Sequence, residues 1–357
     1  MITNQTVPPL PNELIPFPVV ANIDFAQGPI FDKQGNLYFA NYIEEGTIGR
    51  MSPNGTVELW AHTDGCANGL KVDGYGNIVV ADVSPEDGNK GPCRITRIHP
   101  VTKQMEILTD NYNGTPYRGI YEVCLDSKGN IYFSQPRGSY EESPVGGVYM
   151  ITMDSENNPI KVTKVAEGLA YPNGMAFHPE DESRFFVGEM RTRQLPEYFT
   201  VTGEIAKIRI QIKRALERSY GEATNSICKL KTELEQKIDL SNKIKAGNNI
   251  WYDGRIVEYK RHSDGTLSNK RTMIEFPDHS ISGFRFDEYN RLWTANWPGS
   301  TVGVVDVDKG EVLARYEMGG TRVSNLCWWE TSLYVTVATN HSIVRLNVGV
   351  HGAPVIP

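Results

Sequence analysis

The sequence predicts an all-β protein, a six-bladed β-propeller with a helical-hairpin insertion between blades four and five. Three observations support this fold class. One phrase recurs six times along the 357 residues. Each copy joins two short alternating apolar runs through an Asx/Gly turn, which is typical of a β-hairpin. A single four-stranded unit cannot bury both of its faces, but six such units packed radially can. A β-sandwich with coincidental turns is the alternative, and it does not explain so regular a repeat.

The recurring phrase consists of a small or polar residue, usually followed by glycine, then alternating apolar residues, a turn and a second strand. The first copy runs from Gln27 to Asp32, turns at Gly35-Asn36 and continues as residues 37–41. The innermost strand of each blade borders the central channel, so residues that enter these strands should converge on one pocket. We call these six residues the channel ring: Gln27, Asn68, Tyr121, Asn173, Ser282 and Asn325.

We divide the chain into an N-terminal tail (1–20) and the propeller (21–350), which contains a helical insertion (195–253). In the insertion the apolar period changes to about 3.6, the period of a helix. Ile205, Ile208 and Ile212 share one expected helix with Ala215 and Leu216, and Ile227, Leu230, Leu234 and Ile238 share the next. The helical hairpin could cap the pocket as a lid, mediate self-association, or decorate the rim without a function.

The composition excludes several classes of protein. The net charge is −7 with 22% charged residues, which gives no basic footprint for nucleic acid. No apolar stretch is long enough for a membrane span, and 39% hydrophobic residues suit a folded core. Sequons at Asn4, Asn54, Asn113 and Asn340 leave a secreted glycoprotein open, although chance would produce a similar number. The compartment is therefore not fixed by the sequence.

Several phrases resemble the senescence marker protein/gluconolactonase family of calcium-dependent propeller hydrolases, in particular its diisopropyl fluorophosphatase branch. They lie at residues 26–32, 171–174, 295–297 and 324–326. The resemblance covers nearly the whole chain except residues 195–253. It implies a six-bladed propeller with its active site at the channel ring.

The resemblance also implies where calcium would bind. The family's ligand positions fall on Gln27, Tyr121, Asn173 and Ser282, and only Asn173 keeps the family's residue type. Calcium prefers six to eight oxygen ligands, including carboxylates that supply negative charge. Because an amide and a hydroxyl replace the family's Glu and Asp, we expect no metal and no other cofactor. Calcium remains the alternative.

Other reactive side chains give weaker signals. Glu122 could substitute for a lost carboxylate, although a solvated or ion-paired glutamate is the ordinary interpretation. Glu189 ends a strand and is expected to face the channel mouth, which makes it the better candidate. Neither a Ser-His-Asp nor a Cys-His arrangement is recognisable, and Cys124 and Cys327 have the pattern of packing thiols.

The candidate site is therefore a pocket for a small organic substrate. We assign catalytic roles to Gln27, Tyr121, Asn173, Ser282 and Glu189, and substrate-binding roles to Asn41, Asn68, Gln135, Asn296, Trp297 and Asn325. Neutral donors among apolar walls suit a molecule with carbonyl or phenolic oxygens. A structural role in turns is the alternative for Asn68 and Asn325, and packing in the core is the alternative for Tyr121 and Trp297.

Three functions fit this site. The first is a metal-independent enzyme, such as a cyclase of the hetero-Diels-Alder type. Certain divergent fungal propellers that resemble this chain are cyclases of this type. Such chemistry needs proximity of the reacting groups and hydrogen bonds to the substrate. The second is a calcium-dependent lactonase or esterase that has rebuilt its metal shell from Glu122, Glu189, Asp82 and Asn173. The third is a non-catalytic binding propeller that uses the insertion as a partner surface.

Overall fold

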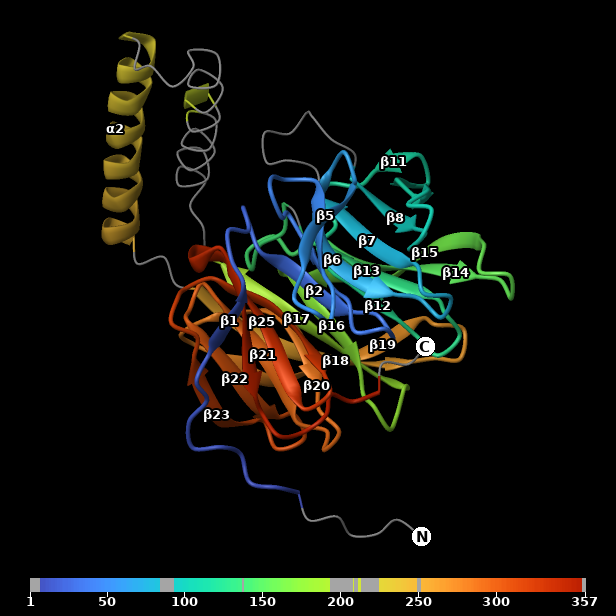
Figure 1. The fold of residues 1–357 in the computed structure, drawn as a ribbon. Coiled ribbons are helices and arrows are strands. Elements are labelled where there is room, and N and C mark those ends of the chain that lie inside the picture. The colour runs from blue at the N-terminus through green and yellow to red at the C-terminus, as the bar shows by residue number, and fades with distance from the viewer. Residues whose placement is uncertain are drawn as a thin grey trace.

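The computed structural model describes residues 7–83, 93–136, 138–192, 208, 211–212, 225–248 and 252–354. It shows six four-stranded antiparallel sheets arranged as blades (Figure 1), which confirms the six-bladed propeller. Blade one contains β2 (Gln27–Phe31), β3 (Leu37–Ala40), β4 (Thr47–Met51) and β5 (Val57–His62). Blade two contains β6 (Cys66–Val72), β7 (Ile78–Val83), β8 (Arg94–Ile98) and β9 (Met105–Thr109), and is followed by the short hairpin β10 (Asn111–Tyr112) and β11 (Thr115–Pro116).

Blade three contains β12 (Val123–Leu125), β13 (Ile131–Gln135), β14 (Gly146–Met153) and β15 (Pro159–Leu169). Blade four contains β16 (Pro172–Phe177), β17 (Arg184–Thr192), β18 (Tyr252–Arg261) and β19 (Leu267–Phe276). Blade five contains β20 (Ser280–Phe286), β21 (Leu292–Trp297), β22 (Thr301–Asp306) and β23 (Glu311–Glu317). In every blade the first strand in this order is the innermost one.

Blade six closes the ring with both ends of the chain. Its inner strands are β24 (Val323–Trp329), β25 (Ser332–Val337) and β26 (Ser342–Asn347), and its outer strand is β1 (Phe17–Val20). β1 pairs antiparallel with β26, so that Phe17 lies opposite Arg345. The segment expected as a tail, residues 1–20, therefore ends in a strand that joins the N-terminal part of the chain to the last blade.

In four blades the aspartate of the repeated phrase shapes the turn after the inner strand. Asp32 accepts hydrogen bonds from the backbone N–H groups of Gln34 and Asn36, both at 2.9 Å. Asp73 and Asp126 bind their own turns in the same way. An aspartate that binds backbone two residues on is typical of an Asx turn, so the sequence motif and the turn have one cause.

Apolar side chains fill the space between neighbouring blades. Tyr38 and Trp60 of blade one, with ring centroids 4.8 Å apart, pack in one buried cluster with Leu70 and Val80 of blade two. Equivalent clusters join the other blades. Because strands alternate their side chains, each blade can contribute one apolar face to each neighbour.

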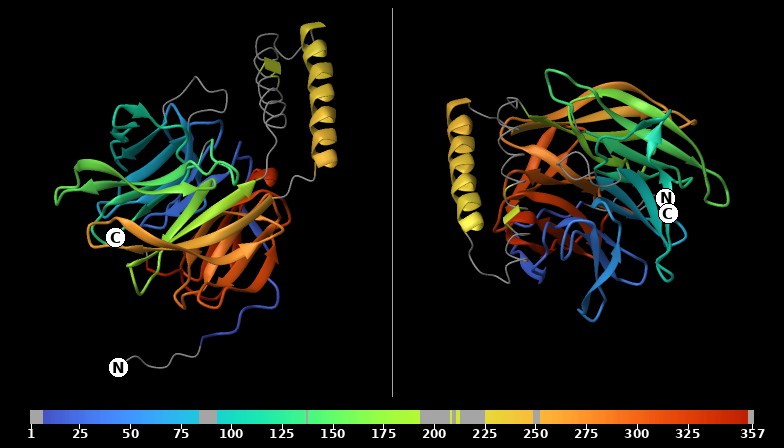
Figure 2. Two further views of the ribbon diagram at one scale, coloured as in Figure 1. Left: turned by 180° about the vertical axis from the view of Figure 1, so that it is seen from behind. Right: turned by 90° about the horizontal axis from the view of Figure 1, so that it is seen from above.

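The insertion contains one long described helix, α2 (Asn225–Asn248). Its position refines the expectation: it lies in the connection between β17 and β18, which pair directly, and so interrupts blade four and does not follow it. The first helix of the predicted hairpin falls largely outside the described residues. Figures 1 and 2 show α2 beside the propeller and not over its centre, so this helix does not cover the channel. Self-association through α2 stays a prediction.

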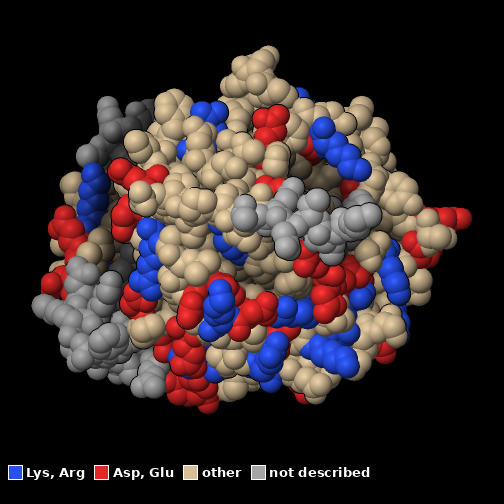
Figure 3. Space-filling view, turned by 90° about the horizontal axis from the view of Figure 1, so that it is seen from below, with Lys and Arg blue, Asp and Glu red and all other residues tan. Residues whose placement is uncertain are grey.

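The surface carries both signs of charge. Figure 3 shows acidic and basic side chains interspersed over the face seen from below. Among the helical residues that the structure describes, none forms a segment long and apolar enough to cross a lipid bilayer. Asn54, Asn113 and Asn340 are exposed, and Asn4 lies outside the described residues. Glycosylation of these sequons stays a prediction.

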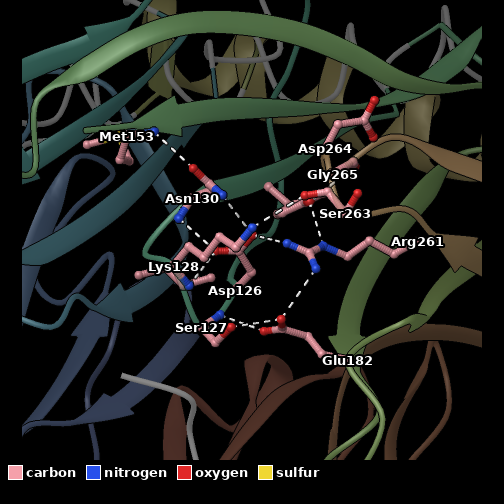
Figure 4. Close-up of polar contacts among 12 residues, drawn as sticks. Asp126, Ser127, Lys128, Asn130, Met153, Glu182, Arg261, Ser263, Asp264 and Gly265 are labelled. Atoms are coloured by element: carbon pink, nitrogen blue, oxygen red, sulfur yellow. Dashed lines mark hydrogen bonds and ion pairs between the residues drawn. The ribbon is translucent and has the colours of Figure 1, made fainter. Parts of the chain in front are cut away.

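A buried arginine connects blades three and four (Figure 4). Arg261 forms an ion pair with Asp126, which is fully buried, and donates from Nε to the Tyr132 hydroxyl at 3.0 Å. It also donates to Glu182 at 3.3 Å, and Glu182 accepts from the backbone N–H of Ser127. One side chain thus holds the turn of blade three against the end of β18.

We expect Arg261→Leu to lower the free energy of unfolding by about 3 kcal/mol, because it leaves the buried Asp126 carboxylate without its cation. The surface pair Lys309–Asp306, whose atoms lie 2.9 Å apart, provides the control. Lys309→Ala should cost less than about 1 kcal/mol. Chemical denaturation of both variants measures the difference, and equal losses would contradict this account.

Candidate functional site

The inner strands share an irregularity where they enter the channel. The register shifts between Gln27 and Ile30 in blade one, and at the matching places in blades two, four, five and six. A bulge of this kind re-aims a side chain and bends the strand. The repeat thus places a polar residue within or at the edge of a bulge in these blades.

Glycines in these bulges allow neighbouring inner strands to approach closely. A Cβ atom at Gly69 would lie 2.8 Å from the Tyr121 carbonyl oxygen and 2.9 Å from Glu122 Oε1. A Cβ atom at Gly283 would lie 2.2 Å from Asn325 Oδ1. No side chain fits at such distances, so glycine is required at Gly69 and Gly283 for these blades to meet.

The structure brings all six positions of the channel ring together. Neighbouring blades are connected in turn: Gly28 packs against the Asn68 carbonyl, Gly69 N–H donates to the Tyr121 carbonyl at 2.8 Å, and Tyr171 donates to Tyr121. Gly174 packs against the Ser282 carbonyl, Gly283 against Asn325, and Ser324 donates to the Ala26 carbonyl at 2.9 Å. The repeat alone predicted this convergence.

Gln27 and Asn68 supply amide groups from adjacent blades. Gln27 is 6% exposed, and Asn68 is half-buried. Neither side-chain amide hydrogen-bonds to another described residue, whereas most buried amides in proteins are paired. These two groups are therefore available to a ligand at the channel ring.

Asn173 and Ser282 lie side by side in blades four and five. Asn173 Nδ2 is 3.5 Å from Ser282 Oγ and 3.1 Å from Met190 Sδ. A thioether is a weak acceptor and 3.5 Å is a long hydrogen bond. Both side chains keep hydrogen-bonding capacity beyond the contact that they make with each other.

Tyr121 forms a pair of phenols with Tyr171, which sequence reasoning missed. Tyr171 donates its hydroxyl proton to Tyr121 at 2.9 Å, and the two rings meet edge to face. Because Tyr121 accepts in this pair, its own O–H is directed to a different acceptor. Trp297 also has a packing role, since it contacts Phe25 edge to face and stacks under the Arg322 guanidinium.

Asn325 differs from the other ring residues because it binds a buried carboxylate. Its Nδ2 donates to Glu122 Oε2 at 2.8 Å, and the other carboxylate oxygen lies 3.5 Å from Lys71 Nζ and 3.6 Å from Arg285 Nη2. Glu122 is 1% exposed and takes the place that glycine occupies in four other blades. The ion-paired interpretation of Glu122 is therefore the one that the structure shows.

The charges of this cluster depend on one another. Burial alone would raise the pKa of Glu122, but the charges of Lys71 and Arg285 outweigh it and lower that pKa below its ordinary value. Burial, aided by the Arg285 charge, lowers the pKa of Lys71 to about 8, although Glu122 opposes this shift. At neutral pH the cluster holds an ionised glutamate between two cations, and the glutamate is a poor proton acceptor.

Three predicted site residues lie at the end of a second strand, and there they bind nearby loops and strands. Gln135 accepts from the Arg118 N–H at 3.2 Å, and Asn296 bonds to Thr301 and Thr294. Asn41 donates to the carbonyls of Phe25 and Ala67 and accepts from the Gly46 N–H. The hydrogen-bonding groups of Asn41 and Asn296 are consumed within the fold, so a structural role outweighs substrate binding for these two residues.

Glu189 does not face the channel mouth, which corrects the expectation for this residue. It is fully buried, forms an ion pair with Arg255, lies 3.0 Å from Lys270 Nζ and accepts from the Ala170 N–H at 2.8 Å. The alternation of β17 turns this side chain toward blade three. Two cations and a backbone donor hold the carboxylate there, so its assigned catalytic role has no geometric support.

The channel ring does not fit a calcium ion. Its donors are neutral amides and hydroxyls, and the nearest carboxylate, Glu122, already binds Lys71, Arg285 and Asn325. Within the described ranges no group of three or more His, Cys, Asp or Glu side chains could hold a metal. Glu122 and Glu189 are each held by cations away from Asn173, so the described residues do not assemble the shell expected from Glu122, Glu189, Asp82 and Asn173.

Comparisons with known proteins agree with this architecture, which is a propeller with its candidate site on the innermost strands. The sequence matches the SMP-30/gluconolactonase/LRE-like region over residues 25–217 and 252–339. The chain belongs to this family.

Named relatives are distant. The gluconolactonase of Zymomonas mobilis is 22% identical over 360 residues, which cover 94% of this chain and 81% of the relative. A gluconolactonase structure from Xanthomonas campestris has a TM-score of 0.65 at 18% identity, covering 95% of this chain and 91% of that one. A calcium-binding regucalcin from Agrobacterium tumefaciens has a TM-score of 0.62 at 13% identity, and the match covers 96% of this chain and 95% of that one. These names support a lactonase more than the expected cyclase.

Asp82 gives a pH-dependent prediction. It is fully buried, neither carboxylate oxygen has a hydrogen-bond partner among the described residues, and Arg94 Nε is 3.6 Å away. Burial raises its pKa to about 7, despite the opposing effects of Thr63 and Arg94. The folded state therefore holds this proton more tightly than the unfolded state, and Asp82 destabilises the fold increasingly as pH rises from about 4 to 7.

We expect Asp82→Asn to raise the free energy of unfolding by about 1–2 kcal/mol at pH 8 and by little at pH 4, since the amide removes a buried charge. Denaturation series at both pH values measure the gain. The exposed Glu311→Gln is the control and should show no such trend. A variant that is less stable at pH 8 than at pH 4, relative to wild type, would contradict the assignment.

Proposed function

We propose that this protein is a hydrolase of neutral lactones or related esters, and that it binds its substrate at the channel ring through uncharged donors. The observation that carries the proposal is the pair of amides, Gln27 and Asn68, whose side chains make no hydrogen bond to another described residue, on the same channel ring as Tyr121. Family membership and the names of the relatives support a lactone as substrate. A polyhydroxylated lactone such as glucono-1,5-lactone also matches a ring rich in amides and hydroxyls.

In this mechanism the lactone carbonyl oxygen accepts hydrogen bonds from the amide N–H groups of Gln27 and Asn68. When water attacks the carbonyl carbon, negative charge develops on that oxygen, and fixed donors stabilise it more than they stabilise the ground state. Tyr121 donates to the ring oxygen as the C–O bond breaks, and Tyr171 supports the polarity of that donor. Asn173 and Ser282 orient the substrate hydroxyls or the attacking water.

Neither of the two candidate carboxylates, Glu122 and Glu189, is placed as a general base for this reaction. Glu122 and Glu189 are both buried and ion-paired. Rate acceleration therefore comes from orientation and from stabilisation of the oxyanion. The water molecule loses its proton to solvent, so the rate should increase with hydroxide concentration.

We expect Gln27→Ala to lower kcat/KM for glucono-1,5-lactone by about 10²-fold, because it removes one oxyanion donor. Tyr121→Phe should lower kcat more than it raises KM. The exposed Gln34→Ala in the turn of the same blade is the matched control and should behave like wild type. The assay follows acid release after subtraction of spontaneous hydrolysis. Wild-type protein without turnover would contradict the proposal and favour the non-catalytic binding propeller.

Calcium provides a separate test. We expect the lactonase rate to change by less than about twofold when a chelator replaces calcium in the buffer, since the channel ring lacks the carboxylates that calcium prefers. Calorimetry with calcium should show no tight stoichiometric site. Activity that disappears with chelator and returns with calcium would show that the ion contributes to this reaction.

A further inference from the structure

A second ring of side chains lies deeper along the inner strands. It consists of the third residue after each channel-ring residue, roughly 10 Å further along a strand. We call it the distal ring: Ile30, Lys71, Cys124, Ala176, Arg285 and Trp328. All six residues line a cavity of about 150 Å³, and the segment Gly352 to Pro354 forms part of its wall. The backbone of this segment is fixed by a hydrogen bond from Ala353 N–H to the Phe286 carbonyl at 2.9 Å.

The walls of this cavity are apolar and partly aromatic, with contributions from Phe177, Phe286 and Trp328. The thiols of Cys124 and Cys327 also line it. Burial raises the pKa of Cys124 to about 11 and that of Cys327 to about 12, so both thiols remain neutral at pH 7. Lys71 and Arg285 are thus the only charged side chains in the described lining.

These two cations are incompletely neutralised. Among the described residues Glu122 is the single carboxylate in contact with them, and its Oε1 lies 3.5 Å from Lys71 Nζ and 3.6 Å from Arg285 Nη2. Lys71 has one further contact, also at 3.5 Å, with the Leu70 carbonyl, and Arg285 donates to the Phe284 carbonyl at 2.7 Å. Two cations and one carboxylate leave one positive charge in a buried site, where an uncompensated charge is unfavourable.

We propose that the distal ring binds a small organic carboxylate with one aromatic ring, of the size of benzoate. The carboxylate would lie against Lys71 and Arg285 and supply the missing negative charge, since guanidinium and ammonium groups are strong donors to carboxylates. The apolar body would fill the cavity, because a void of about this volume with apolar walls accommodates one benzene ring. This site is separate from the proposed lactone site at the channel ring and does not depend on it.

The walls distinguish this ligand from a simple inorganic anion. Sulfate or phosphate could bind the two cations but would place polar oxygens against the rings of Phe177, Phe286 and Trp328, and the indole N–H of Trp328 is already bonded to the Val350 carbonyl. A neutral aromatic molecule would pack against the apolar walls but leave the positive charge unpaired. A benzoate-like molecule satisfies both parts of the site.

The test is calorimetric titration of the full chain with benzoate, benzyl alcohol and sulfate at pH 7. Benzoate should bind at least tenfold more tightly than benzyl alcohol, which has the same ring without the charge. Sulfate should neither bind with comparable affinity nor displace benzoate. Comparable affinities for benzoate and benzyl alcohol would overturn the proposal, and so would displacement of benzoate by sulfate.

Variants locate the site. Lys71→Met should weaken benzoate binding at least tenfold and leave benzyl alcohol binding unchanged, and the exposed Lys33→Met is its matched control. Ala176→Leu fills the cavity without changing a charge and should abolish both interactions, which keeps the test decisive if the lysine variant does not fold. Gln27→Ala should leave benzoate binding intact. Loss in Gln27→Ala together with retention in Ala176→Leu would place benzoate at the channel ring and overturn the proposal. Lactone turnover is not measured in this test, so its outcome is independent of the proposed hydrolase.

Discussion

The buried carboxylate of Glu122 is the constraint around which the middle of this propeller is organised. It stands where four other inner strands have glycine, and its side chain reaches Lys71 of blade two, Arg285 of blade five and Asn325 of blade six. Four blades are thus connected through one group. Gly69 is required beside it, because a Cβ atom there would lie 2.8 Å from the Tyr121 carbonyl oxygen and 2.9 Å from Glu122 Cα. The glutamate in blade three therefore restricts which residue types its contacts in the other blades can have.

The same kind of ion pair keeps the buried carboxylates away from the candidate catalytic surface at the channel ring. Carboxylates at the ends of second strands, such as Glu189, are held by arginine and lysine between blades, and Glu122 is held below the channel ring. The ring itself keeps only amides and hydroxyls. Chemistry at such a surface relies on oriented dipoles, which act strongly where water is excluded but cannot accept a proton as a carboxylate can. This is why the proposed reaction is hydrolysis without a protein base.

Most of the fold could be predicted from the sequence because the repeat encodes it locally. The aspartate that starts most of the turns, the glycine after four of the six ring residues and the alternating strands are visible one blade at a time, and they specify Gln27 and its equivalents as neighbours. The position of α2 within blade four and the buried orientation of Glu189 could not be predicted, since both depend on which strands pair. Lys71 and Arg285 did leave a signal: each is a lone charge in an apolar inner strand, at the same distance from its ring residue. Tyr171 left none, because its contact with Tyr121 depends on a loop conformation.

The two ends of the channel consequently have opposite chemistry although the same six strands build both. At the channel ring the repeat places polar residues at the bulges of the inner strands, and the blades differ in which neutral group they present. Three residues deeper the repeat calls for apolar packing, so Lys71 and Arg285 replace side chains that would otherwise fill the channel. Retaining two cations there is unfavourable for folding unless Glu122 or a ligand neutralises them. Glu122 neutralises one unit of that charge, and the remaining unit is a property of the distal ring that packing alone does not explain.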